Sequence, residues 1–361
     1  MEEKGKKGRM DYTLLLIVVL LVMIGLVILY STSAYNGQVK FHDSFYYLKK
    51  QAFATVLGIV LMLFVAGMDY HIWQRLAVFG YLAAVALSVA VMLFGREING
   101  SKRWLALGPF SFQPSEFAKV ALILFLADLV TKNVKTIGKM WTLCRIMFWI
   151  LPIVGLVGAS NLSTAIIILG IGVILIFVAS PKYAQFALMG IAGACFMGIF
   201  LALESYRLER LAIWRNPEKY EKGYQTLQGL YAIGSGGVFG VGIGNSVQKL
   251  GFVPEAQNDM IFSIICEELG LAGAGIIVFL FLLLIWRFFL IASGSRDLFG
   301  ALIATGAMAH MMIQVILNIA VVTNTIPNTG ITLPFISYGG TSVMFLLIEM
   351  GLVLSVSQVV D

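Results

Sequence analysis

The sequence predicts an all-α integral membrane protein with about ten transmembrane helices, and three observations support this class. Of the 361 residues, 59% are hydrophobic and only 12% are charged, whereas soluble domains carry roughly a quarter charged residues. The charges are clustered, which leaves apolar runs long enough to cross a hydrocarbon core of roughly 30 Å. These runs lack the alternation of β-strands, so helices must satisfy the backbone in lipid. A soluble fold is excluded, and residues 1–361 form one membrane domain.

The predicted spans follow the apolar runs in chain order. They are residues 13–34, 51–68, 72–94, 116–131, 146–159, 162–180, 184–204, 260–290, 299–322 and 340–359. The first run exceeds the roughly 7–15 apolar residues of a signal peptide, so it is an anchor. The fifth and sixth spans form one stretch interrupted only by Ser160-Asn161. Merging them would give nine spans and reverse the orientation of the rest.

The distribution of Lys and Arg favours ten spans with both termini in the cytoplasm. The tail 1–11 carries four basic residues, and the loop 132–145 carries four more. The positive-inside rule places both in the cytoplasm. The long connection 206–258, between spans seven and eight, then lies outside. A loop of this length is usually functional or disordered, and its regularly spaced apolar residues predict short helices at the membrane surface.

Charge and composition exclude several function classes. The net charge of +6 is scattered among membrane loops, so anionic lipid, as head group or substrate, is the expected partner rather than nucleic acid. Three cysteines and three histidines lie far apart and provide neither a disulfide framework nor zinc-ligand spacing. The sequence therefore indicates no metal site and no cofactor, and it leaves a divalent-cation requirement open.

A first polar cluster lies around the start of the fourth span and comprises 100–104 and 113–119. Pro114 suits the first turn of a helix, which places Glu116 and Lys119 on one helix face. Charges inside a bilayer usually pair and face a polar cavity. A purely structural ion pair and a substrate contact are equally compatible with this spacing.

Two further clusters lie at the same predicted outer side. In 254–259, Asp259 directly precedes the eighth span. It suits a general base at the membrane surface or a helix N-cap, and the residues alone slightly favour the cap. In 327–342, prolines and glycines interrupt the helix, as irregular backbone does where it lines a cavity. The alternative there is a simple re-entrant turn between spans nine and ten.

These clusters resemble the FtsW/RodA/SpoVE (SEDS) family of cell-wall polymerases, and the resemblance runs from the first span to the last. It rests on the motifs at 100–104, 113–116, 223–225, 234–237, 254–259, 267–270 and 333–340. The run Asn258-Asp259 and the segment 332–340 look closer to the septal FtsW branch than to RodA. The family's usual Gln-Pro-Asp-x-Gly-Thr turn corresponds to residues 159–164 of this chain. Asn161 stands there at the position of the family's aspartate.

The resemblance implies a function and a set of site residues. Members polymerise lipid II in the bacterial cytoplasmic membrane together with a class B penicillin-binding protein and other division or elongation membrane proteins. We therefore expect a multi-pass enzyme at the division septum. The family's essential aspartate falls on Asp259, which replaces the N-cap interpretation. The expected substrate-binding residues are Lys119, Glu116, Arg103, Arg207, Arg210, Gln257, Glu267, Ser337, Gly339 and Ser342.

The expected reaction is an inverting glycosyl transfer that releases undecaprenyl pyrophosphate, with Asp259 as the base and basic residues near the pyrophosphate. Two alternatives remain open at this point. A lipid II transporter would use the same intramembrane ion pair and broken helices, and a non-catalytic division scaffold would only recruit partners. A carboxylate at the outer surface beside a long ordered loop favours the enzyme.

Overall fold

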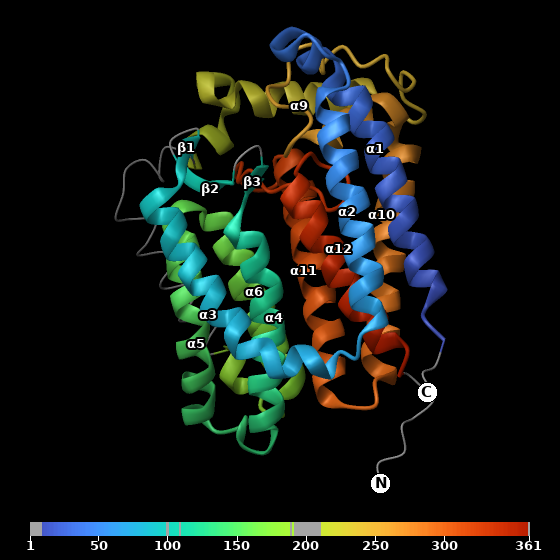
Figure 1. The fold of residues 1–361 in the computed structure, drawn as a ribbon. Helices are drawn as coiled ribbons and strands as arrows, with labels where there is room; N and C mark the ends of the chain where they lie inside the picture. The colour runs from blue at the N-terminus through green and yellow to red at the C-terminus, as the bar shows by residue number, and fades with distance from the viewer. Residues whose placement is uncertain (1–8, 99–100, 108–109, 188–189, 191–210, 360–361) are drawn as a thin grey trace.

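The structure is a computed structural model that describes residues 9–98, 101–107, 110–187, 190 and 211–359. Its long helices stand side by side in a bundle (Figure 1). Eight helices in the described part of the chain are long and apolar enough to cross a membrane. They are α1 (Tyr12–Phe41), α2 (Tyr46–Gly67), α3 (His71–Phe94), α5 (Met140–Ser160), α6 (Leu162–Ala179), α10 (Ile261–Gly294), α11 (Leu298–Val322) and α12 (Gly340–Ser357). This confirms a polytopic, mainly α-helical membrane protein.

The predicted fourth span is also a helix, α4 (Pro114–Asn133), which begins with Pro114 in its first turn. Glu116, Lys119 and Asp128 make it too polar to resemble a lipid-facing span. All three side chains are buried, and α4 packs against α3, α5, α6 and α11. Neighbouring helices therefore shield its charges from lipid, as expected for ionisable residues inside a bilayer.

Helices α5 and α6 form an antiparallel hairpin, which confirms the fifth and sixth spans as separate. Asn161 interrupts the helix with extended backbone angles and caps α6 by accepting a bond from Thr164 N. A Cβ at Gly158 would lie 3.4 Å from Ala165, and a Cβ at Gly172 would touch Ile150. These pairs approach each other on opposite sides of the turn, so the chain reverses direction at Asn161.

The start of α1 and the end of α12 lie at the same end of the bundle, because Asp11 N donates to Ser357 Oγ over 3.1 Å. We call this the inner end and the opposite end, which carries Asp259, the outer end. The placement of the α1 start and the α12 end on one side agrees with an even number of spans. The predicted seventh span, 184–204, falls mostly outside the described residues.

The predicted loop 95–115 contains a small antiparallel sheet, which the sequence analysis did not anticipate. Its strands are β1 (Arg96–Ile98), β2 (Ser101–Leu107) and β3 (Phe110–Phe112), in the order β1-β2-β3. Strand β2 packs against α3, α4 and α5. The sheet therefore covers the outer end of these helices (Figure 1). Arg103 of β2 contacts the α5–α6 turn through Ser160 O.

The connection before α10 contains the predicted short helices. Two 3₁₀ turns, Pro217–Lys219 and Glu221–Gly223, precede α9 (Tyr224–Ser235), and α9 lies across the outer end of the bundle (Figure 1). The segment 236–242 then inserts into a break in α10 at Gly270, where φ is 67°. Main-chain bonds of 2.9 Å join Val241 N and Gly242 N to the carbonyls of α10 before the break. The glycines of this segment therefore allow it to pack closely against α10, since a Cβ at Gly240 would lie 2.2 Å from Glu268 O.

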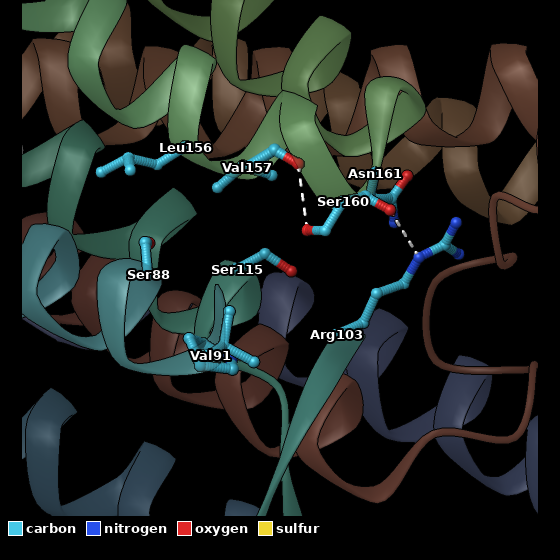
Figure 2. Close-up of a pocket in the computed structure, with 9 residues that line it drawn as sticks. Ser88, Val91, Arg103, Ser115, Leu156, Val157, Ser160 and Asn161 are labelled. Carbon is cyan, nitrogen blue, oxygen red and sulfur yellow. Dashed lines mark hydrogen bonds between the residues drawn. The ribbon is translucent and has the colours of Figure 1, made fainter. Parts of the chain in front are cut away.

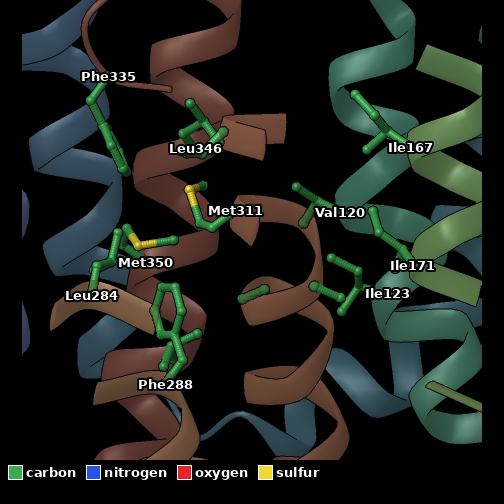
Figure 3. Packing of buried hydrophobic residues seen from close by; sticks show 14 of the residues in the cluster. Val120, Ile123, Ile167, Ile171, Leu284, Phe288, Met311, Phe335, Leu346 and Met350 are labelled. Atoms are coloured by element: carbon green, nitrogen blue, oxygen red, sulfur yellow. The ribbon is translucent and has the colours of Figure 1, made fainter. Parts of the chain in front are cut away.

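Helix α11 lies at the centre of the bundle, in contact with α4, α6, α10 and α12. Figure 3 shows the apolar side chains that fill the space around it, with Val120 and Ile171 towards one side and Phe288 and Met350 towards the other. A central helix with several neighbours can hold polar side chains away from lipid. The candidate site uses polar side chains of α11 that are shielded in this way.

Candidate functional site

Asp259 lies at the outer end of the bundle, in the turn that precedes α10. Its side chain is partly exposed, and Gln225 of α9 donates to its Oδ1 over 3.5 Å. Helix α10 starts after Met260, and no side chain caps it, so the N-cap interpretation is wrong. Burial raises the pKa of Asp259 to about 6, and the charge of Glu255 adds to this effect. Such a carboxylate is ionised at neutral pH and is a stronger proton acceptor than an ordinary aspartate.

The irregular segment 323–339 meets the Asp259 turn through main-chain groups. Ser337 Oγ donates to Asn258 O over 2.7 Å and accepts from Leu333 N. Tyr338 N donates to Gln257 O over 2.9 Å. Two clusters that lie far apart in sequence are therefore joined in space, as the outer-side prediction requires.

Two amide side chains from α1 and α2 complete this joint. Asn36 of α1 donates to Gln257 Oε1 over 3.0 Å, and Gln51 of α2 accepts from Gly339 N over 3.1 Å. Gln257 and Ser337 are themselves buried. Gln257, Ser337 and Gly339 therefore form the wall of the site, and in this structure their polar groups contact protein partners.

Helix α11 contacts the same irregular segment through two amides one helical turn apart. Gln314 Nε2 donates to Thr332 O over 3.1 Å. Asn318 Nδ2 donates to Ile331 O over 2.7 Å and to Asp259 O over 2.8 Å. The central helix thus fixes both the irregular segment and the main chain of Asp259.

The predicted pair on α4 is a buried salt bridge, with Lys119 Nζ 3.0 Å from Glu116 Oε1. Lys119 also donates to Gln314 Oε1 over 3.2 Å, and Ser342 lies within reach of Glu116. Glu116 Oε2 is buried without a hydrogen-bond partner in the described residues. The pair is therefore connected through Gln314 to the segment that contacts Asp259.

The polar chain continues inward through residues that the sequence analysis did not select. His310 bridges Gln314 Oε1 and Glu349 Oε2, each over 2.8 Å, and both ionisable residues are buried. An ionisable residue inside a span is itself a signal of function or pairing. That signal is present in the sequence, where the scattered histidines argue only against a metal site.

Arg103 lies apart from Asp259, on β2 against the α5–α6 turn. Its Nε donates to Ser160 O over 2.9 Å, as Figure 2 shows. Together with Ser88, Ser115 and Asn161 it lines a pocket of about 10 Å³, which is room for one water molecule. Arg103 thus anchors the sheet to the position where this chain has Asn161.

Glu267 and Glu268 point in different directions and hold the outer loop. Glu267 accepts bonds from Ser246 Oγ and Val247 N. Glu268 forms a 2.6 Å salt bridge with Lys249, and Ser31 donates to it. All of these polar side chains are buried. Glu267 was expected at the substrate. In this structure its carboxylate accepts hydrogen bonds from the loop 246–248.

Two expected arginines and the possibility of a metal site remain to be described. Arg207 and Arg210 lie outside the described residues. Among the residues that are described, no group of three or more His, Cys, Asp or Glu side chains has an arrangement suited to a metal ion. The site that the structure brings together consists of Asp259, Gln257, Ser337, Gly339, Glu116, Lys119 and Ser342, linked by Asn318 and Gln314.

These features define a multi-pass membrane protein with a carboxylate site at one end of its bundle and a buried polar chain behind it. The family described as "Cell cycle protein" (FtsW, RodA, SpoVE) matches residues 12–361. The chain belongs to this family.

Two relatives are similar to nearly the whole chain. The chain is 40% identical to "Stage V sporulation protein E" of Bacillus subtilis (strain 168), with 98% of each chain covered. It is 35% identical to "Probable peptidoglycan glycosyltransferase FtsW" of Trichlorobacter lovleyi, with 96% of this chain and 93% of that one covered.

Solved structures share the fold. One of them, described as "Structural coordination of polymerization and crosslinking by a peptidoglycan synthase complex", has a TM-score of 0.83 and 30% identity, covering 96% of this chain and 97% of that one. The rod shape determining protein RodA of Thermus thermophilus has a TM-score of 0.72 and 28% identity, with 96% of each chain covered.

Proposed function

We propose that this chain is a peptidoglycan glycosyltransferase that transfers a growing lipid-linked glycan strand onto lipid II and releases undecaprenyl pyrophosphate. The observation that carries the proposal is Asp259, a partly exposed carboxylate with a raised pKa at the outer end of the bundle. Side chains of α11 and of the irregular segment, Asn318 and Ser337, donate to main-chain carbonyls of its turn and hold the turn in place. Its relatives include proteins named as probable peptidoglycan glycosyltransferases.

In the proposed reaction Asp259 accepts the proton of the acceptor sugar's 4-hydroxyl. The hydroxyl oxygen then bonds to the donor's anomeric carbon with inversion, and the bond from that carbon to the pyrophosphate oxygen breaks. A general base of this kind contributes roughly 10²–10⁴-fold to the rate. The departing pyrophosphate needs cationic or amide groups, for which Arg103, Lys119, Arg207, Arg210 and Arg215 are the candidates.

Lys119 is the candidate whose surroundings are described most fully. It is 2% exposed and already paired with Glu116. Contact with a pyrophosphate therefore requires Lys119 to give up its bond to Gln314 or to move outward. Glu116 would then act as the counter-ion of the lysine rather than contact the sugar itself.

An apolar groove between α1 and α2 supports a lipid-linked substrate. It has a volume of about 170 Å³ and is lined by apolar side chains together with Thr55, including Val22 and Met23 of α1 and Ile59 of α2. An isoprenoid chain has the matching chemistry, because it exposes no polar atom that such a surface would leave unpaired. We propose that lipid tails lie between spans while the sugars meet at the outer end.

The partners and location follow from the same proposal. We propose a class B penicillin-binding protein as the crosslinking partner, because a similar fold was solved in a peptidoglycan synthase complex. The proposed site is the bacterial cytoplasmic membrane at the division septum, with the outer end facing away from the cytoplasm. Other division or elongation membrane proteins would join there.

The test uses purified full-length protein in detergent with lipid II. Only a polymerase forms glycan under these conditions. A transporter would move lipid II across a membrane, which is absent in detergent, and a scaffold catalyses no reaction. Asp259→Asn preserves size and should lower the polymerisation rate by roughly 10²–10⁴-fold with unchanged thermal stability. A stable Asp259→Asn protein that polymerises at the wild-type rate would end the general-base assignment.

A further inference from the structure

We propose that Asn318 is a positioning residue, which sets where the Asp259 carboxylate stands relative to the reacting hydroxyl. The inference rests on the proposed function, because it assigns a role within the same site. Asn318 does not touch the Asp259 side chain in the described contacts. Asn318 acts through its hydrogen bonds to the main-chain carbonyls of Asp259 and Ile331.

The hydrogen bonds of Asn318 fix the orientation of its amide. Its Nδ2 donates to Asp259 O over 2.8 Å and to Ile331 O over 2.7 Å. Both partners are carbonyl oxygens, which only accept, so the nitrogen must face them. The side chain is fully buried, and its Oδ1 has no hydrogen-bond partner in the described residues. A buried acceptor without a partner is unfavourable, so the two donor contacts explain why an amide occupies this position.

Both carbonyls belong to segments that have no regular structure of their own. Asp259 lies in the turn before α10, and Ile331 lies in the irregular segment between α11 and α12. A helix or sheet ladder holds neither of them. Asn318 belongs to α11, the central helix, so one side chain connects both irregular segments to the centre of the bundle.

Gln314 extends the same arrangement one helical turn away. Its Nε2 donates to Thr332 O, and its Oε1 accepts from Lys119. Consecutive carbonyls, Ile331 and Thr332, are therefore held by consecutive turns of α11. Through these two amides α11 determines the separation between Asp259 and the buried Lys119. A shift of about 1 Å in a reacting group can cost about 100-fold in rate.

The test compares Asn318→Leu with a matched control. Leucine has a similar volume and no donor, so it releases both carbonyls without opening a cavity. Gln51→Leu is the control, because Gln51 also holds the irregular segment, through Ser337 and Gly339, but makes no contact with Asp259. If Asn318→Leu folds poorly, Asn318→Asp serves as a second variant. It keeps a polar side chain of the same size but loses both N–H donors. Lipid II polymerisation is measured per folded molecule, with kcat and KM separated and the pH profile recorded.

We expect Asn318→Leu to lower kcat by about 10–100-fold while KM stays within about twofold. The acid limb of its pH–rate profile should move to lower pH, because a displaced Asp259 becomes better solvated. Glu255 is the charged neighbour that acts on Asp259, and Gln225 and Asn318 are its neutral ones. The Gln51→Leu protein should keep the wild-type acid limb.

Each outcome decides the inference. An active wild-type protein whose Asn318→Leu variant has normal kcat and an unchanged acid limb overturns the positioning role alone. Equal changes in the Asn318 and Gln51 variants show general loosening of the segment and also overturn it. A wild-type protein that makes no glycan removes the proposed function, and the positioning role with it.

Discussion

Replacing Lys249 by methionine removes one half of a buried ion pair while preserving most of its side-chain volume. Lys249 Nζ lies 2.6 Å from Glu268 Oε1, and the two side chains are 7% and 0% exposed. The change leaves the Glu268 carboxylate buried without its counter-ion. Breaking one partner of such a pair typically costs about 3–5 kcal/mol.

The contacts of Glu268 place the cost at the lower end of that range. Ser31 Oγ lies 2.7 Å from each carboxylate oxygen, so the charge keeps a donor after Lys249 is gone. We expect a loss of about 3 kcal/mol, roughly a 150-fold change in the folded-to-unfolded ratio. Thermal unfolding of the purified protein, followed by tryptophan fluorescence in detergent, measures the change.

The chain provides a matched control in Lys49, which pairs with Asp43 at 2.8 Å but is 69% exposed. Exposed pairs contribute little, because solvent screens them, so Lys49→Met should unfold almost as the wild type does. The double variant Lys249→Met/Glu268→Gln should recover most of the lost stability, since no charge is left buried. Equal unfolding temperatures for Lys249→Met and Lys49→Met would refute the argument from burial.

Three further predictions follow from other parts of the bundle. Lys119→Met should lower both abundance and polymerisation by leaving Glu116 uncompensated, and full recovery of polymerisation in Glu116→Gln/Lys119→Met would show that neither charge handles substrate. Gly270→Ala should destabilise the protein by about 1–3 kcal/mol, because φ there is 67° and a Cβ would meet Gly240 N at 2.4 Å; Gly275→Ala, where a Cβ meets nothing within 4 Å, should be neutral or better in the same thermal assay. The polymerisation rate should fall as pH drops below about 6, because protonation of Asp259, whose pKa is raised to about 6, removes the base; a rate that stays constant down to pH 4.5 would contradict this.

The spans and the outer polar clusters could be predicted because each depends on local sequence. Apolar length determines a span, and Pro114 with the Glu116–Lys119 spacing determines a helix start and a shared face. The α5–α6 division at Asn161 was also predictable, from one short polar interruption and the charge of the loops around it.

The contacts that organise the site could not be predicted in the same way, because they join segments far apart in sequence. Asn318 is an ordinary amide in an apolar helix until Asp259 and Ile331 are placed beside it. Glu267 was expected at the substrate from the family resemblance. In this structure its partners are Ser246 and Val247, which come from a loop whose path the sequence does not specify.

The insertion of 236–242 into α10 determines which piece of this protein can be exchanged with a relative. Leu271 N and Ala272 N of α10 donate to Gly237 O and Val238 O, each over 2.9 Å. The loop thus supplies the partners that the helix loses at its break. A Cβ at Gly240 would lie 2.2 Å from Glu268 O, so the fit depends on glycines from both segments. A chimera that replaces 206–258 alone would separate the two halves of this joint, whereas one that carries 206–272 would transfer it intact.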